Sequence, residues 1–113
     1  MRIALHSTIR PGAVGEYRQH HARIPDELRD VFERVGIHDW VIWRSGDRLF
    51  HVVDVDDFDA AFAALGDDPA NARWQADIGR FVDRFFGAEG SPGLEPLEAV
   101  WSLRRQQQDE ASP

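Results

Sequence analysis

Apolar positions between residues 14 and 36 recur with the period of one helical face. The stripe has alternating spacings of three and four and consists of Val14, Tyr17, His21, Ile24, Leu28, Val31 and Val35. This spacing predicts a helix that ends near Gly36, because glycine tolerates the left-handed backbone that follows many helix C-termini. Pro25 has no amide hydrogen for the carbonyl of His21, so the helix should bend or break at that point.

Strand patterns flank this helix on both sides. Arg2–Ile9 alternates, and Ile3, Leu5, Ser7 and Ile9 share one face. Residues 37–43 and 49–55 are rich in β-branched and aromatic residues. The turn residues Arg44-Ser45-Gly46-Asp47 lie between them, which completes a hairpin signature. A last strand is expected at residues 97–103, LEAVWSL.

Two further helical segments are expected between the hairpin and the last strand. Asp56 or Asp57 can cap a short helix that runs through Leu65. A second segment begins at residues 67–69, Asp-Asp-Pro, and is expected to reach about Phe86. Its apolar face consists of Trp74, Ile78, Phe81, Val82 and Phe85.

The predicted order is β-α-β-β-α-β, the α+β ferredoxin-like arrangement, in which two helices cover one face of a four-stranded antiparallel sheet. Residues 1–103 are expected to form a single domain, and residues 104–113 a polar, disordered tail. Trp40 and Ile42 alternate with Val41 and Trp43, so both faces of that strand are apolar. A sheet face in contact with water should be polar. We therefore expect a second copy of the chain to cover it, in a dimeric α+β barrel.

Composition excludes several classes of partner. The net charge of −7 argues against a nucleic-acid or anionic-membrane surface, since either needs a basic patch. No apolar stretch approaches the roughly 18 residues of a membrane span. The first residues read as a strand and not as a signal peptide, and the chain has no cysteine for a disulfide or a thiolate site. A cytoplasmic protein is the default expectation.

Tyr17 and His21 are the titratable members of the helical stripe, one turn apart and next to the break at Pro25. They suit a pocket with acid/base chemistry, and equally suit the edge of a core with a tolerated kink. The four tryptophans suit core and dimer packing, although a flat indole also stacks on a sugar and its N–H binds a hydroxyl. Trp74, beside the polar Gln75, is the better ligand contact. No HxxxH or HxH pair exists, so no metal site is expected.

Motifs along nearly the whole chain, to about Leu103, resemble the L-rhamnose mutarotase family of small dimeric ferredoxin-like enzymes. They are Tyr17-x3-His21-x2-Ile24-x2-Glu27-Leu28, Gly36-x-His38-x-Trp40-x-Ile42, Arg73-Trp74, Ser91-Pro92 and Leu97-Glu98-Ala99-Val100-Trp101-x-Leu103. The resemblance implies a homodimeric isomerase of carbohydrate metabolism without a cofactor. Such an enzyme interconverts the anomers of L-rhamnose or a related 6-deoxy sugar such as L-fucose.

The resemblance also implies roles by position. The family's acid/base histidine falls on His21 and its substrate-contacting tyrosine on Tyr17. A second aromatic contact, commonly tyrosine, falls on Trp40, and a pair of tryptophans that lines the sugar pocket falls on Trp74 and Gln75. Trp40 thus lacks a phenol hydroxyl and Gln75 lacks an indole, and both departures would change which sugar fits.

Two other classes of function remain open. In a small ferredoxin-like monooxygenase or a haem-degrading protein, His21 or His6 would meet a cofactor or an aromatic substrate. In a non-catalytic ligand-binding or dimerisation module, a sugar would bind without anomer exchange. The fold alone does not separate these classes.

Overall fold

Alternating and helical patterns become four strands and five helices in residues 1–111, the part of the chain that the computed structural model describes. The elements in order are β1 (Arg2–Ile9), α1 (Val14–His20), α2 (Asp26–Arg34), β2 (Ile37–Ser45), β3 (Arg48–Val55), α3 (Phe58–Gly66), α4 (Pro69–Ile78), β4 (Val82–Phe86) and α5 (Leu103–Ala111). The first strand, the hairpin and the helix from Phe58 agree with the sequence prediction.

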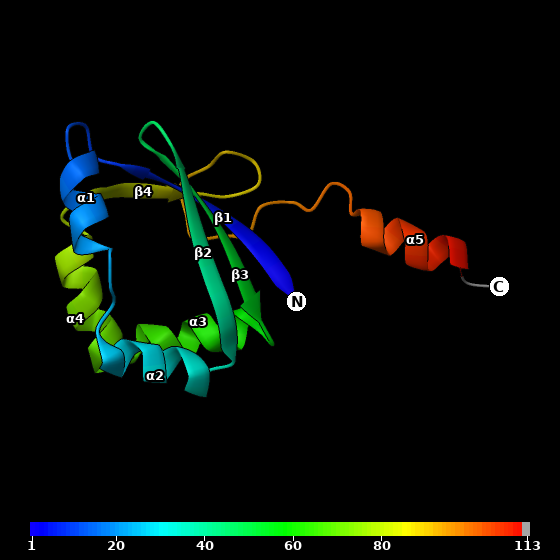
Figure 1. Ribbon diagram of the computed structural model, residues 1–113, viewed down its shortest axis with the longest axis horizontal. Helices are drawn as coiled ribbons and strands as arrows, with labels where there is room; N and C mark the ends of the chain where they lie inside the picture. The colour runs from blue at the N-terminus through cyan, green and yellow to red at the C-terminus, as the bar shows by residue number, and fades with distance from the viewer. Residues whose placement is uncertain (112–113) are drawn as a thin grey trace.

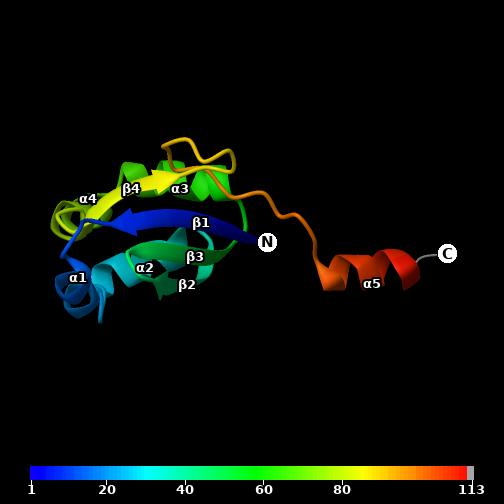
Figure 2. The ribbon, with the colours of Figure 1, turned by 90° about the horizontal axis from the view of Figure 1, so that it is seen from above.

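The strands form one antiparallel sheet in the order β2-β3-β1-β4. Helices α1 to α4 lie on one side of it in Figure 1, and Figure 2 shows the strands side by side. The α+β ferredoxin-like prediction is therefore confirmed. Leu5 and Val53 on the central strands are fully buried beneath the helices. The sheet register places Leu5 opposite His51, and Ser7 between Leu49 and Phe85.

Pro25 divides the predicted helix of residues 14–36 into two. His21 is the C-cap of α1, and Pro25 is the N-cap of α2. The carbonyl of Pro25 accepts hydrogen bonds from the amides of Leu28 and Arg29, both 3.1 Å long, which start the new helix. The predicted break is confirmed, and it leaves His21 in a turn between two helices.

The prediction of a helix to Phe86 was wrong. α4 ends at Ile78, and residues 82–86 form β4, the edge strand beside β1. The register shifts between Thr8 and Ile9, so that Arg84 and Val82 pair with consecutive residues. This bulge brings Val82 and Phe85 to the same face although they are three residues apart. A bulged strand thus reproduced the spacing of a helix.

The predicted last strand at residues 97–103 was also wrong. Only the amide of Leu97 reaches the sheet, where it donates a 2.8 Å hydrogen bond to the carbonyl of Ala4. The same edge of β1 is already paired with β4 from His6 to Ile9. Where a polar tail was expected, the described residues contain α5, which buries none of its side chains and lies apart from the sheet in both ribbon views (Figures 1 and 2).

Aspartates start the two helices that follow the hairpin. Asp57 accepts a 3.0 Å hydrogen bond from the amide of Ala60 and caps α3. Asp68 accepts from the amides of Ala70 and Asn71, at 2.8 and 3.2 Å, and caps α4. Each cap satisfies amides that have no partner inside the helix. The acidic residues at these positions therefore have the structural role expected from the sequence.

The outer face of the sheet carries apolar side chains without helices over them. Trp43 is 56% exposed and Phe50 39% exposed. His6 stacks between Phe50 and Phe86, with ring centroids 5.1 and 5.4 Å away. The Nε2 atom of His6 and the hydroxyl of Thr8 are buried without a hydrogen-bond partner among the described residues. This face is unusual for a sheet that meets only water.

Candidate active site

A cavity of about 1000 Å³ lies between the inner face of the sheet and helices α1 to α4. All five residues singled out from the sequence line it: Tyr17, His21, Trp40, Trp74 and Gln75. They come from α1, the turn after it, β2 and α4, so only the folded chain brings them together. The volume suits a small organic ligand.

His21 and Tyr17 stand on the helix side of the cavity. Their ring centroids are 5.4 Å apart, and the His21 ring lies perpendicular to that of Trp74 with a centroid separation of 5.1 Å. Burial lowers the pKa of His21 below 6.5, the hydrogen bond with its own backbone opposes this, and neighbouring His20 lowers it further. His21 is therefore a neutral base near pH 7. Burial raises the pKa of Tyr17 to about 12, so its phenol stays protonated.

Trp74 also contacts His20. The two rings stack with centroids 5.6 Å apart, and His20 lies 3.9 Å from the carboxylate of Asp77. His20 lies outside the apolar stripe of the helix, yet its side chain is only 32% exposed. Trp74 itself is 8% exposed and contacts both histidine rings.

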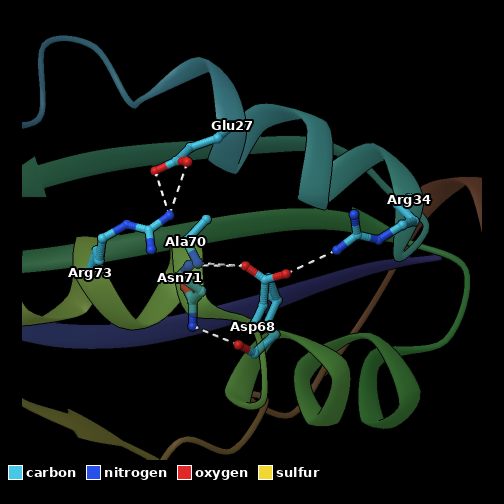
Figure 3. A network of polar contacts seen from close by, with 7 residues as sticks. Glu27, Arg34, Asp68, Ala70, Asn71 and Arg73 are labelled. Atoms are coloured by element: carbon cyan, nitrogen blue, oxygen red, sulfur yellow. Dashed lines mark hydrogen bonds and ion pairs between the residues drawn. The ribbon is translucent and has the colours of Figure 1, made fainter.

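Ion pairs join α2 to α4 beside the cavity (Figure 3). One Arg73 nitrogen donates to both carboxylate oxygens of Glu27 at 2.9 Å. Arg34 donates to Asp68, also at 2.9 Å, while Asp68 caps α4. Arg73 directly precedes Trp74, so these contacts fix the helix that presents Trp74 and Gln75 to the cavity.

The sheet side of the cavity carries two polar residues that the sequence reasoning did not select, Ser7 and His51. Their exposed fractions are 0% and 4%. The Ser7 hydroxyl and the His51 Nε2 atom are 2.9 Å apart, and the indole N–H of Trp40 donates to His51 Nδ1 over 3.1 Å. Burial lowers the pKa of His51 to about 4, with smaller contributions from His21 and His6.

A sequence signal for this pair did exist. Ser7 interrupts an otherwise apolar strand face of Ile3, Leu5 and Ile9, and His51 interrupts one of Leu49, Val53 and Val55. A polar residue on a buried strand face needs a partner. Two such interruptions on neighbouring strands therefore point to one another, once the strand order is known.

Within residues 1–111, no three His, Cys, Asp or Glu side chains converge as metal ligands would. In the same residues, no helix has both the length and the apolarity to span a membrane. The predicted cytoplasmic location stays a prediction.

Comparison with known proteins assigns the family. The family model described as L-rhamnose mutarotase matches residues 2–103, which is most of the chain. The chain belongs to the L-rhamnose mutarotase family. The resemblance found in the sequence, and with it the prediction of an isomerase that interconverts sugar anomers, is confirmed at this level.

Two curated L-rhamnose mutarotases match over almost their full length. That of Jannaschia sp. (strain CCS1) is 26% identical over 90% of this chain and 97% of its own. That of Brucella anthropi is 29% identical over 90% of this chain and 95% of its own.

Solved structures show the same fold at lower identity. An L-rhamnose mutarotase from Formosa agariphila superposes with a TM-score of 0.71 at 19% identity, over 91% of this chain and 98% of that one. A putative antibiotic biosynthesis monooxygenase from Bordetella bronchiseptica reaches a TM-score of 0.62 at 18% identity, over 88% of this chain and 96% of that one. These likenesses show the fold alone, and the family match and the cavity carry the functional argument.

Proposed function

We propose that the protein exchanges the α and β anomers of a neutral monosaccharide, L-rhamnose or a related 6-deoxy sugar such as L-fucose, in the cavity between the sheet and the helices. The observation that carries this proposal is the meeting of a half-buried neutral histidine, a protonated phenol and indole rings in one cavity of suitable size. This set matches the needs of a polar, uncharged ligand with hydroxyl groups and C–H faces.

Anomer exchange requires the pyranose ring to open and close. The proton of the anomeric hydroxyl leaves, the bond from the anomeric carbon to the ring oxygen breaks, and the ring oxygen gains a proton. The resulting aldehyde rotates, and the reverse steps close the ring. In this proposal the neutral imidazole of His21 takes the proton of the anomeric hydroxyl, and the imidazolium so formed gives the ring oxygen the proton that it gains. The phenol of Tyr17 donates a hydrogen bond that orients the sugar or relays a proton.

Trp40 and Trp74 form the walls against which the sugar ring packs, and Gln75 offers an amide to a hydroxyl. The resemblance places a phenol at position 40 and an indole at position 75 in relatives, so these two residues are the proposed source of any difference in sugar preference. The Gln75 amide both donates and accepts hydrogen bonds, whereas an indole only donates. A sugar with a hydroxyl beside Gln75 would therefore gain a hydrogen bond that an indole cannot accept.

The decisive measurement is proton exchange spectroscopy on equilibrated L-rhamnose, L-fucose and other aldoses. Saturation transfer between the two anomeric protons should increase with added protein. His21→Ala should abolish the increase, while Arg18→Ala, an exposed change on the same helix, should leave it intact. Exchange should also fall on acidification, through a pKa below 6.5, as His21 becomes protonated. A wild-type rate in His21→Ala would refute the assigned role.

We also propose that the chain is a homodimer in which a second copy covers the outer sheet face. The exposed rings of Trp43 and Phe50 and the unpartnered polar atoms of His6 and Thr8 support this. Val100 and Trp101, which are 87% and 67% exposed, offer further apolar surface. Sedimentation should give a dimer for wild type, and Trp43→Glu should shift it to monomer. A wild-type monomer at high concentration would contradict the proposal.

A further inference from the structure

Three side chains on the sheet side of the cavity form a continuous hydrogen-bonded chain, from Trp40 through His51 to Ser7. The two distances are 3.1 Å from the indole nitrogen to Nδ1 and 2.9 Å from Nε2 to the serine oxygen. All three residues line the cavity. The roles given above to Tyr17, His21, Trp74 and Gln75 do not use this chain.

The direction of the chain follows from the chemistry of its first member. An indole N–H is a donor only, so Nδ1 of His51 must accept and cannot carry a hydrogen. A neutral imidazole with a bare Nδ1 carries its hydrogen on Nε2. That hydrogen points at Ser7, so the serine oxygen accepts it.

The hydrogen of the Ser7 hydroxyl is then left over. Ser7 is fully buried, and within residues 1–111 its hydroxyl has no second hydrogen-bond partner that could accept this hydrogen. A hydroxyl that already accepts one strong bond favours donating its own hydrogen, because bonds in a chain polarise one another. Ser7 lines the cavity but has no exposed surface in the sugar-free protein, so a bound sugar reaches its hydroxyl after a small shift of the side chains around it.

We propose that Ser7 donates a hydrogen bond to an oxygen atom of the bound sugar, and that Trp40 and His51 are positioning residues that hold it as a donor. This inference rests on the proposed function and extends it. The sugar is then bound from two sides of the cavity, by His21 on the helix side and by the Ser7 hydroxyl on the sheet side. It also gives Trp40 a second role, since its N–H fixes the His51 tautomer.

The surroundings of His51 favour the same arrangement. Burial is the main factor that disfavours a proton on the His51 ring, and His21 across the cavity and His6 on the neighbouring strand add to it when they are themselves protonated. On the remaining side, Phe85 of β4 packs against the His51 ring with centroids 5.4 Å apart and offers no charge. A doubly protonated His51 would also direct its Nδ1 hydrogen at the hydrogen of Trp40. The ring is therefore held neutral in one tautomer.

The first test is kinetic. Ser7→Ala should lower kcat/KM for anomer exchange roughly tenfold, the loss of about one hydrogen bond. Ser45→Ala is the matched control, because it makes the same change at an exposed serine at the end of β2 that does not line the cavity. Exchange in Ser45→Ala should stay at the wild-type rate. An unchanged kcat/KM in Ser7→Ala would overturn the inference.

The second test separates positioning from a merely structural role. If His51 acts only through Ser7, His51→Leu should cost about as much as Ser7→Ala, and the double variant no more than either alone. Additive losses would refute this coupling. Independently, nitrogen NMR of the sugar-free protein should show His51 with its hydrogen on Nε2, and Trp40→Phe should allow both tautomers. A hydrogen on Nδ1 in wild type would overturn the chain.

Failure of the proposed function looks different. It would appear as wild-type protein that accelerates exchange of no sugar, whereas failure of the inference would appear as active wild type with an equally active Ser7→Ala.

Discussion

Because of His51, the free energy of unfolding should decrease in acid. His38 should change the pH dependence in the opposite direction. His51 is 4% exposed, and burial lowers its pKa from 6.5 to about 4. Between these two pH values the unfolded chain binds a proton that the folded chain refuses. Stability contributed by neutral His51 is therefore complete above pH 6.5 and falls as the pH decreases toward 4.

The magnitude follows from the difference between the two pKa values. At about 1.4 kcal/mol for each pKa unit, the loss near pH 4 is on the order of 3 kcal/mol, a large share of a small domain's stability. His38 lies at the surface, where the hydrogen bond to Asp56, 2.8 Å long, raises its pKa. Its contribution is present below the unfolded pKa and disappears as the pH rises through the raised value.

Urea unfolding at several pH values between 4 and 8 measures both effects. Wild type should lose more stability on acidification than His51→Gln, which cannot ionise. His38→Gln is the matched control and should change the curve in the opposite sense, if at all, since the pair is exposed. Parallel pH curves for wild type and His51→Gln would show that burial does not keep His51 neutral, and the reasoning would fail.

Three further predictions concern contacts that shape the site. Asp68→Ala should lower the free energy of unfolding by about 1 kcal/mol through loss of the α4 cap. Asp68→Asn can still cap the helix and should lower it by clearly less, which thermal melts of the two variants would measure. Gly36→Ala should cost on the order of 1–2 kcal/mol in urea unfolding, because φ is +86° and a Cβ would lie 3.0 Å from Asp56. Arg73→Ala should change stability by less than about 1 kcal/mol, since its pair with Glu27 is exposed; a larger loss would mean that the link between helices matters more than its exposure suggests.

Local rules sufficed for much of the fold. The alternation of Arg2–Ile9 predicted β1, the turn residues 44–47 predicted the hairpin, and the missing amide hydrogen of Pro25 predicted a broken helix. β4 was missed because a bulge placed Val82 and Phe85 on one face at a helical spacing. A bulge depends on the partner strand, which the sequence of the strand itself does not reveal.

The site also contains residues that local patterns predict and residues that come together only through strand pairing. Tyr17 and His21 are neighbours on one helical turn, and motif order added Trp40, Trp74 and Gln75, all of which line one cavity. Ser7 and His51 are 44 residues apart and meet only through the pairing of β1 with β3. Their contact depends on register, which a single strand does not specify.

The four indoles are divided evenly between the interior and the surface. Trp40 and Trp74 face the cavity, and each touches a histidine, whereas Trp43 and Trp101 are more than half exposed. The protein therefore contains its own optical reporter. With Trp43 and Trp101 replaced by phenylalanine, the remaining emission would come only from the cavity, and its intensity would follow ligand occupancy and the protonation of His21 without any attached dye.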